Sequence, residues 1–271
     1  MPNHVTNKVN FNGNPERIKE LREKCKYGDT SFQFQAFFPM PIELIGTRSP
    51  AKIVSEEELQ EWKGKLANGE FKEWEADSRP ITQKESDELI KKYGCNNWYD
   101  WHLLNWGTKW DCYDLIIFDD DRIQFNTAWS TPALCMQRLS ELFPDVEIEV
   151  RYADEDFGSN VGTYTLLNGE FTNMYQPKYS KESVLLAMDI LEEKEYWIED
   201  RLCEVYEGEE LNDFELWLVE IAHEEGNLID GYPILVLEKL LELAIQDEQY
   251  ERAANIKKLI DLKLNSENIE K

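Results

Sequence analysis

Four of the chain's nine tryptophans lie within thirteen residues: Trp98, Trp101, Trp106 and Trp110. Each indole ring has about 150–250 Å² of surface to bury and an N–H group that needs an acceptor. A run this dense belongs where several elements pack together, or where the protein grips a ligand. We favour packing, with the rings holding a helical segment against a sheet; stacking of bases or sugars on the rings is the alternative.

The segments before this run predict a β-α-β opening. Residues His4–Phe11 alternate as a strand does, and they include two valines. Asn14 followed by Pro15 is typical of a helix N-terminus, and the apolar spacing continues that helix to Cys25. The alternation of Phe and Gln predicts a second strand over 32–38, ended by the prolines that follow.

A helical insertion is predicted over about 43–105. Ser55 and Thr82 are each followed three residues later by Glu, which is the capping-box signature of a helix start. The polar stretch 68–80 between these two helices predicts a loop, and Gly107 ends the helix within the tryptophan run. The predicted helices are 56–67, 83–93 and 98–105.

The chain then returns to strands. Asn168-Gly169 between two short apolar runs is the strongest short-range hairpin signal. We expect one strand of the central pair to be an addition at the sheet edge, which leaves the order β-α-β-β-α-β. This is the ferredoxin-like arrangement, an α+β fold with an antiparallel sheet and helices on one face. The predicted elements are strands 113–118 and 122–129, helix 133–143, strand 146–152 and hairpin strands 163–167 and 170–174.

After residue 178 the apolar spacing becomes helical throughout. We therefore expect a ferredoxin-like domain over 1–178 and an acidic helical region over 179–271. Two apolar stripes close the chain, and the short polar link between them can only bring their helices together antiparallel. This predicts a helical hairpin over 234–264.

The net charge of −26 is concentrated in this last third. Residues 179–271 hold nine Lys and Arg against 25 Asp and Glu, a net charge of −16. Such a surface disfavours direct binding to nucleic acid or to an anionic membrane, because phosphate groups need cations. It suits a basic protein partner, or is simply a solvated surface. We expect a cytoplasmic protein, since no signal peptide or apolar span is found.

Few residues form patterns that are typical of catalysis. The sequence has no phosphate-binding loop, nucleophile elbow or zinc-protease motif, and only His4, His102 and His223 supply imidazoles. The first two are interpreted as a hydrogen-bonded histidine at the sheet margin and a ring stacked in a core. His223 ends a predicted helix, where a cation suits the helix dipole. We expect no catalytic residue and no cofactor.

Three groups of residues could be drawn as metal sites, and metal binding is not predicted at any of them. The five cysteines are odd in number and have no CxxC pair, so they are interpreted as small apolar residues of a reducing compartment. Carboxylate runs between strands are more often solvated turns than metal sites. The sites considered were Cys95 with His102 and Cys112, Asp119–Asp121, and Asp154–Asp156.

Several phrases of residues 1–175 resemble the Api-type family of phage- and plasmid-encoded proteins with a ferredoxin-like domain. The resemblance implies that fold and a mobile-element setting, and it implies no catalytic residue. The insertion and the residues after Lys178 depart from the family's core pattern. The phrases are MPNHVTN at 1–7, FPMP at 38–41, NWGTKW at 105–110, FNTAWSTP at 125–132 and YADE at 152–155.

The final hairpin resembles a second family. Leu237–Ile245 followed by Tyr250–Lys257 is similar to the UVR motif, the helical hairpin of excision-repair subunits and of some protease adaptors. The resemblance implies protein–protein contact, commonly by pairing with another such hairpin. Ala253 and Ala254 are small enough for two helices to approach closely, whereas Lys257 replaces the family's usual arginine. An ordinary hairpin packed on the domain is the alternative.

Together these features predict a non-enzymatic binding or adaptor protein of a bacterial mobile element. Its partner would be a protein that is basic or carries a similar helical hairpin. The alternatives are a DNA mimic that inhibits a host restriction or defence enzyme, and an enzyme acting on a carbohydrate or nucleotide near the tryptophans. The candidate binding residues are Trp106, Lys109, Trp110, Trp129, Tyr250, Ala253, Ala254 and Lys257.

Overall fold

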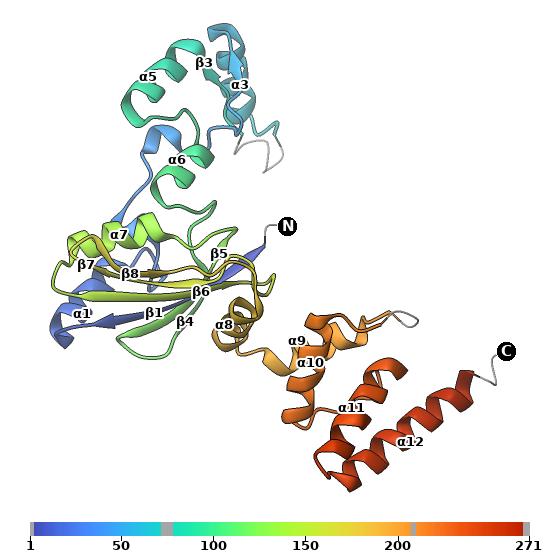
Figure 1. Cartoon of the computed structure of the whole chain (residues 1–271). Coiled ribbons are helices and arrows are strands. Elements are labelled where there is room, and N and C mark those ends of the chain that lie inside the picture. Colours follow the sequence, from blue (N-terminus) through green and yellow to red (C-terminus); the bar gives the residue numbers. More distant parts are fainter. Residues whose placement is uncertain (1–2, 72–77, 207–209, 268–271) are drawn as a thin grey trace. The chain divides into compact units, whose positions relative to one another are not determined.

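The computed structural model describes residues 3–71, 78–206 and 210–267 (Figure 1). The chain divides into two compact units, Met1–Ile190 and Leu191–Lys271. The apolar spacing predicts that the sheet domain ends at residue 178 and that helices follow. The compact units divide later, so that helix α8 (Lys181–Leu191) falls almost wholly in the first unit.

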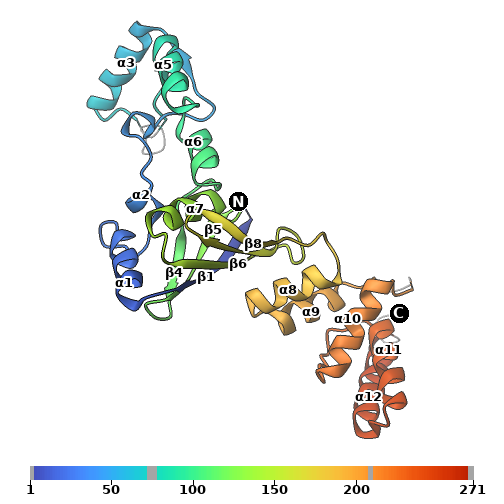
Figure 2. The same cartoon turned by 60° about the vertical axis from the view of Figure 1, so that its left-hand side comes forward.

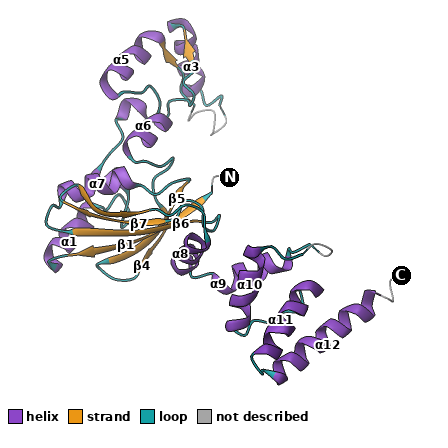
Figure 3. Ribbon diagram, in the orientation of Figure 1, coloured by secondary structure: helices purple, strands orange, loops and turns teal. Residues whose placement is uncertain are grey.

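The first unit is built on a six-stranded antiparallel sheet with the order β4-β5-β1-β6-β7-β8 (Figure 3). Helix α1 (Pro15–Lys24) follows β1, and α7 (Ala133–Leu142) follows β5. The sequence β1-α1-β4-β5-α7-β6 with this strand order is the predicted ferredoxin-like arrangement. The strands are β1 (His4–Asn12), β4 (Tyr113–Ile117), β5 (Arg122–Ala128), β6 (Glu147–Asp154), β7 (Gly162–Leu167) and β8 (Glu170–Tyr175).

The predicted strand over 32–38 is wrong. Residues Phe34–Phe37 form the short helix α2. Since no strand forms here, β4 and β5 both belong to the ferredoxin-like core, and the expectation that one of them is an addition to it is wrong too. A strand would direct Phe37 to the face opposite Phe34. The helical turn instead buries both rings, and the Asp111 carboxylate accepts the first backbone N–H groups of the helix.

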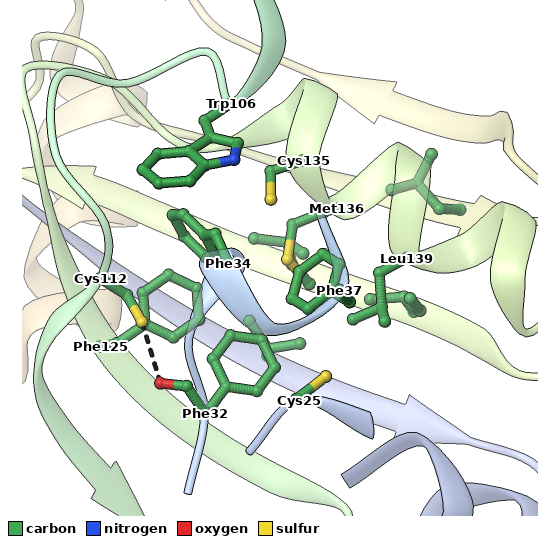
Figure 4. Packing of buried hydrophobic residues seen from close by; sticks show 14 of the residues in the cluster. Cys25, Phe32, Phe34, Phe37, Trp106, Cys112, Phe125, Cys135, Met136 and Leu139 are labelled. Carbon is green, nitrogen blue, oxygen red and sulfur yellow. Dashed lines mark hydrogen bonds between the residues drawn. The ribbon is translucent and has the colours of Figure 1, made fainter. Parts of the chain in front are cut away.

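The main hydrophobic core lies on the sheet face that α1 and α7 cover. Ile18 and Leu21 come from α1, and Met136 and Leu139 from α7. Figure 4 shows Met136 and Leu139 pointing into the phenylalanine cluster beneath α7. Helix α8 lies on the other side of the sheet from α7 (Figures 1 and 2), where its residue Asp189 pairs with Arg151 of β6.

The insertion contains the three predicted helices α3 (Glu56–Ala67), α5 (Gln83–Tyr93) and α6 (Trp98–Asn105). Ser55 forms the predicted capping box with Glu58, and Thr82 accepts the backbone N–H of Glu85. Two short parallel strands, β2 (Ile53–Val54) and β3 (Ile81–Thr82), and a 3₁₀ turn (Ile42–Leu44) were not predicted. Of the predicted loop 68–80, residues 72–77 lie outside the described residues.

The second unit consists of helices. They are α9 (Lys194–Cys203), α10 (Asp213–Glu224), α11 (Ile234–Gln246) and α12 (Tyr250–Glu267). The last two pack together as a helical hairpin. None of the helices in the described ranges combines the length and the apolar character that crossing a membrane requires.

Candidate functional site

The tryptophan-rich run divides into buried and exposed rings. Trp101 and Trp106 retain 4% and 2% of their accessible surface, whereas Trp110 retains 38%. Trp129, which follows β5, retains 44%. Trp101 and Trp106 are therefore packed, as the favoured interpretation expects, whereas Trp98 is half-buried and Trp110 is exposed.

Trp106 lies in the core. Its indole N–H donates a 2.9 Å hydrogen bond to the carbonyl of Phe38, and its ring meets Phe34 edge-on at 5.7 Å between centroids (Figure 4). The imidazole of His102 stacks on the Trp106 ring, with 4.0 Å between the ring centroids. Of the four N-terminal candidates, Trp106 is the one whose ring is closed to a ligand in this structure.

The other three candidates meet on the surface. The ammonium group of Lys109 lies 4.5 Å from the ring centroid of Trp110 and 4.5 Å from that of Trp129. Tyr113 contacts Trp110 edge-on at 6.4 Å, and Tyr99 contacts Trp129 edge-on at 6.3 Å. We call these five residues the tryptophan patch. A cation between aromatic rings gains about 0.5–1 kcal/mol at an exposed site, so Lys109 holds the two indoles in place.

The sheet brings these segments together. Ala128 pairs with His4, and Asn126 pairs with Tyr113, so the end of β5 lies between the starts of β1 and β4. Trp129 follows directly and adopts a left-handed backbone with φ of 71°. A left-handed residue other than glycine costs of order 1 kcal/mol or more and persists only where its surroundings impose it.

Hydrogen bonds from three directions impose this backbone. The N–H of Trp129 donates to the carbonyl of Asn3, and its carbonyl accepts a bond from the side-chain amide of Asn160. Asn160 also donates to Asp154, which fixes the amide. Beside them, Thr108 donates its hydroxyl hydrogen to the carbonyl of Ala128. The patch is thus tied to the sheet by buried and half-buried polar groups.

The five residues of the tryptophan patch include no carboxylate, although Asp114 and Glu155 lie near Tyr113. Burial, together with the negative charges of Asp114 and Glu155, raises the pKa of Tyr113 to about 12, so its phenol is neutral at physiological pH. That hydroxyl lies 2.7 Å from Nδ1 of His4, the histidine expected at the sheet margin. The exposed face therefore offers indole and phenol rings around one ammonium group.

Several of the candidate metal-binding side chains are engaged by other groups of the protein. The carbonyl of Lys109 binds His102, whereas Cys112 donates to the carbonyl of Phe32. The carboxylate of Asp119 pairs with Arg122, which lowers the pKa of Asp119 to about 2. Asp154 binds the side-chain amides of Asn3 and Asn160. Across the described residues, no three His, Cys, Asp or Glu side chains converge as a metal site does.

The C-terminal candidates lie on both sides of α12. Ala253 is buried toward the hairpin interior at 7% exposure. Tyr250 is 67% exposed, and Ala254 and Lys257 are exposed on the outer side of the same helix. An open hollow of about 680 Å³ lies beside Tyr250, lined also by Gly226, Leu228, Glu248, Gln249, Glu251, Arg252 and Asn255.

Arg252 has a structural role that was not predicted from the sequence. Its guanidinium donates to the carbonyls of Ala222 and His223 at the end of α10, and to the carbonyl of Asn227 beyond it. The sequence-based interpretation assigned the helix-dipole role to His223; in the structure Arg252 is the cation at these carbonyls. His223 is buried and bonds through Nε2 to Asp247, 2.9 Å away. The sequence signal available for this role was an arginine in the first turn of the last helix.

The comparison with family models agrees with the ferredoxin-like fold. Residues 105–198 match the model of a family described as the ferredoxin-like domain in Api92-like protein. A crystal structure of a protein Api92 from Yersinia pseudotuberculosis is similar at 12% identity and a TM-score of 0.36, over 66% of this chain and 99% of that one. No curated protein matches. The family match covers β4 to α8, the part of the sheet unit that follows the insertion, and ends within α9 at Ile198. Residues 105–198 are therefore similar to the ferredoxin-like domain of Api92-like proteins.

Proposed function

We propose that the chain is a protein-binding protein of a bacterial mobile element, acting in the cytoplasm without catalysis of its own. The observation behind this proposal is the tryptophan patch, in which Trp110 and Trp129 remain 38% and 44% exposed around Lys109. Tryptophan is among the residues most enriched at the energetic centres of protein interfaces. The mobile-element setting rests on the resemblance to Api-type proteins.

The rigidity of the patch supports binding rather than incidental exposure. Two indoles held by one ammonium group, with Trp129 in a strained backbone, lose little side-chain freedom when a partner covers them. Each ring can still bury much of its surface, and about 25 cal/mol per Å² of apolar area is gained on burial. Protein partners therefore fit this surface better than highly charged ligands do.

The test compares partner capture by matched variants. Photo-crosslinking in the host bacterium, with the full chain as bait, is expected to yield partners that the double variant Trp110→Ala/Trp129→Ala loses by at least tenfold. Tyr27→Ala is the control, because Tyr27 is a 52% exposed aromatic residue of the same unit outside the patch. Equal capture by all three proteins, or capture of nothing by the wild type, would contradict the proposal.

The hairpin is a second candidate contact. Tyr250, Ala254 and Lys257 line its outer side, where a similar hairpin of a partner could pack against the small Ala254. This extends the resemblance to the UVR motif. Substituting Ala254→Arg should remove hairpin-dependent partners while the tryptophan-dependent ones persist, because the residue is exposed and its replacement leaves the hairpin interior unchanged.

A second candidate function follows from the charge of the helical unit. Residues 191–271 contain 23 Asp and Glu but only eight Lys and Arg. Such a surface can occupy the phosphate-binding groove of a restriction or defence enzyme. This candidate predicts that the gene raises the plating efficiency of unmodified phage on restricting cells. It also predicts that purified chain inhibits the restriction enzyme at low salt and loses this effect at high salt.

A further inference from the structure

Strand β4 ends the six-stranded sheet on one side. It pairs with β5 alone among the described strands, and the sheet order leaves its outer edge open (Figure 3). The backbone N–H of Phe118 donates to the carbonyl of Arg122, so the groups of Ile116 and Phe118 face β5. Because alternate residues of an antiparallel strand point to opposite neighbours, Ile117 presents its N–H and C=O groups to the open edge. The C=O of Leu115 points the same way, since it lies trans to the N–H of Ile116 in a planar peptide.

The side chains along this edge are apolar on both faces of the sheet. Ile116, Ile117 and Phe118 are 47%, 46% and 58% exposed. Ile116 lies opposite Gln124 and Ile117 opposite the buried Ile123, so the two isoleucines project to different faces. Proteins usually protect sheet edges with charged residues, prolines or short strands.

The other edge of the sheet is more polar. Strand β8 carries Glu170, Thr172 and Asn173 along its exposed length, followed by the exposed Met174 and Tyr175. Each edge strand has one register shift in the pairing with its neighbour. The feature that distinguishes β4 is its uninterrupted run of three exposed apolar residues, 116–118.

Charge specifies what can lie against β4. Asp114 precedes the apolar segment, and Asp119, Asp120 and Asp121 follow it, with Arg122 as the nearby cation. An antiparallel second copy centred on Ile116 and Ile117 would set Asp114 of one molecule opposite Asp119 of the other. Like charges directly opposite are destabilising, and each copy also has a net charge of −26. A segment with basic residues at both ends removes this repulsion.

We propose that the β4 edge binds an extended segment of a partner protein, apolar at its centre and flanked by Lys or Arg, as a seventh strand of the sheet. Such strand addition takes its affinity from main-chain hydrogen bonds and its specificity from the flanking side chains. This inference rests on the proposed protein-binding function and assigns to it a second surface and a class of partner.

The test uses the full chain and a synthetic peptide, Lys-Arg-Val-Ile-Val-Thr-Arg-Lys. Amide exchange read by NMR is expected to be fast at Ile117 in the free protein and to slow at least tenfold with saturating peptide. A counterpart with Glu and Asp in place of the basic residues should bind at least tenfold more weakly. Unchanged exchange at Ile117 would overturn the proposal. So would concentration-dependent protection without peptide, which would show that a second copy occupies the edge.

A matched pair of variants separates main-chain from side-chain binding. Ile117→Pro removes the outward N–H and leaves the ladder to β5, whereas Ile117→Ala removes the side chain and keeps the N–H. We expect peptide binding to be at least tenfold weaker for the proline variant and less than fivefold weaker for the alanine variant. Circular dichroism should show that both variants are folded. Equal losses, or none, would overturn strand addition.

The tryptophan patch keeps this result separate from the proposed function. The variant Trp110→Ala/Trp129→Ala should bind the peptide as the wild type does, because neither residue belongs to β4. If the peptide fails to bind while patch-dependent partners are still captured, only the β4 inference falls. If those partners are absent and the peptide binds, the patch proposal falls instead.

Discussion

The imidazole of His102 stacks on the indole of Trp106, with 4.0 Å between the ring centroids and 17° between their planes. Nδ1 of His102 lies 2.8 Å from the carbonyl of Lys109, which can only accept, so this nitrogen carries the proton. Nε2 is buried and finds no partner among the described residues. Burial lowers the pKa of His102, and the neutral ring packs as an aromatic side chain.

Acid should therefore destabilise the fold at this residue. The unfolded chain takes up a proton at His102 near pH 6.5, whereas the folded chain takes it up only at lower pH. Between these pKa values the unfolded state binds more protons, so the free energy of unfolding decreases as the pH falls below 6.5. His102→Gln does not titrate and should lose less stability than the wild type between pH 7.5 and 5.

Urea unfolding at the two pH values measures this difference. His4 and His223 are present in both proteins, so their contributions cancel in the comparison. An equal loss of stability in the variant and the wild type would contradict the assignment.

Removing the Asp111 carboxylate should destabilise the sheet unit strongly. Its oxygens accept the backbone N–H groups of Phe34, Gln35 and Cys112 at 2.8, 3.0 and 2.8 Å. Asp111→Ala leaves these half-buried donors unpaired, at a cost of about 3 kcal/mol in the free energy of unfolding. Asp111→Asn keeps one acceptor and should cost less. Glu88→Ala serves as the control in the same urea titration, because Glu88 is an exposed helical residue of the same unit, and the expected change is below about 0.5 kcal/mol.

Elements whose signals are local could be predicted from the sequence. The capping residues Ser55 and Thr82 bond to amides three residues away, and both helices begin where expected. Asn168 and Gly169 adopt left-handed φ values of 52° and 77°, as a two-residue hairpin turn requires. Helix α2 was missed because its N-terminus is capped by Asp111, 77 residues along the chain from Phe34. Nothing within 32–38 indicates that contact.

In the candidate site, too, the sequence predicts only what local features determine. Trp106 and Trp110 stand four residues apart in one run, and no local feature distinguishes the buried ring from the exposed one. The difference depends on tertiary contacts, namely the Phe38 carbonyl for Trp106 and, for Trp110, the ammonium group of Lys109 that it shares with Trp129. Sequence reasoning could therefore select the run and could not sort its rings.

Arg252 should hold the helical unit together. Its guanidinium meets three carbonyl groups at and beyond the end of α10, and burial lowers its pKa without removing its charge at neutral pH. Arg252→Met should cost about 2–3 kcal/mol in the unfolding of this unit, because hydrogen bonds from a charged donor are lost. Lys257→Met on the outer side of the same helix is the control. Amide exchange of α10 measures both, and equal exchange in the two variants would contradict this role.

Trp129 allows stability and binding to be separated by a pair of substitutions. Both Trp129→Ala and Trp129→Gly remove the indole from the tryptophan patch, so both should lose the partners that depend on the patch. Only glycine adopts the left-handed φ of 71° without strain. The glycine variant should therefore be more stable than the alanine variant by about 1 kcal/mol in urea unfolding. A more stable alanine variant would mean that the backbone of residue 129 relaxes once the indole no longer contacts Lys109.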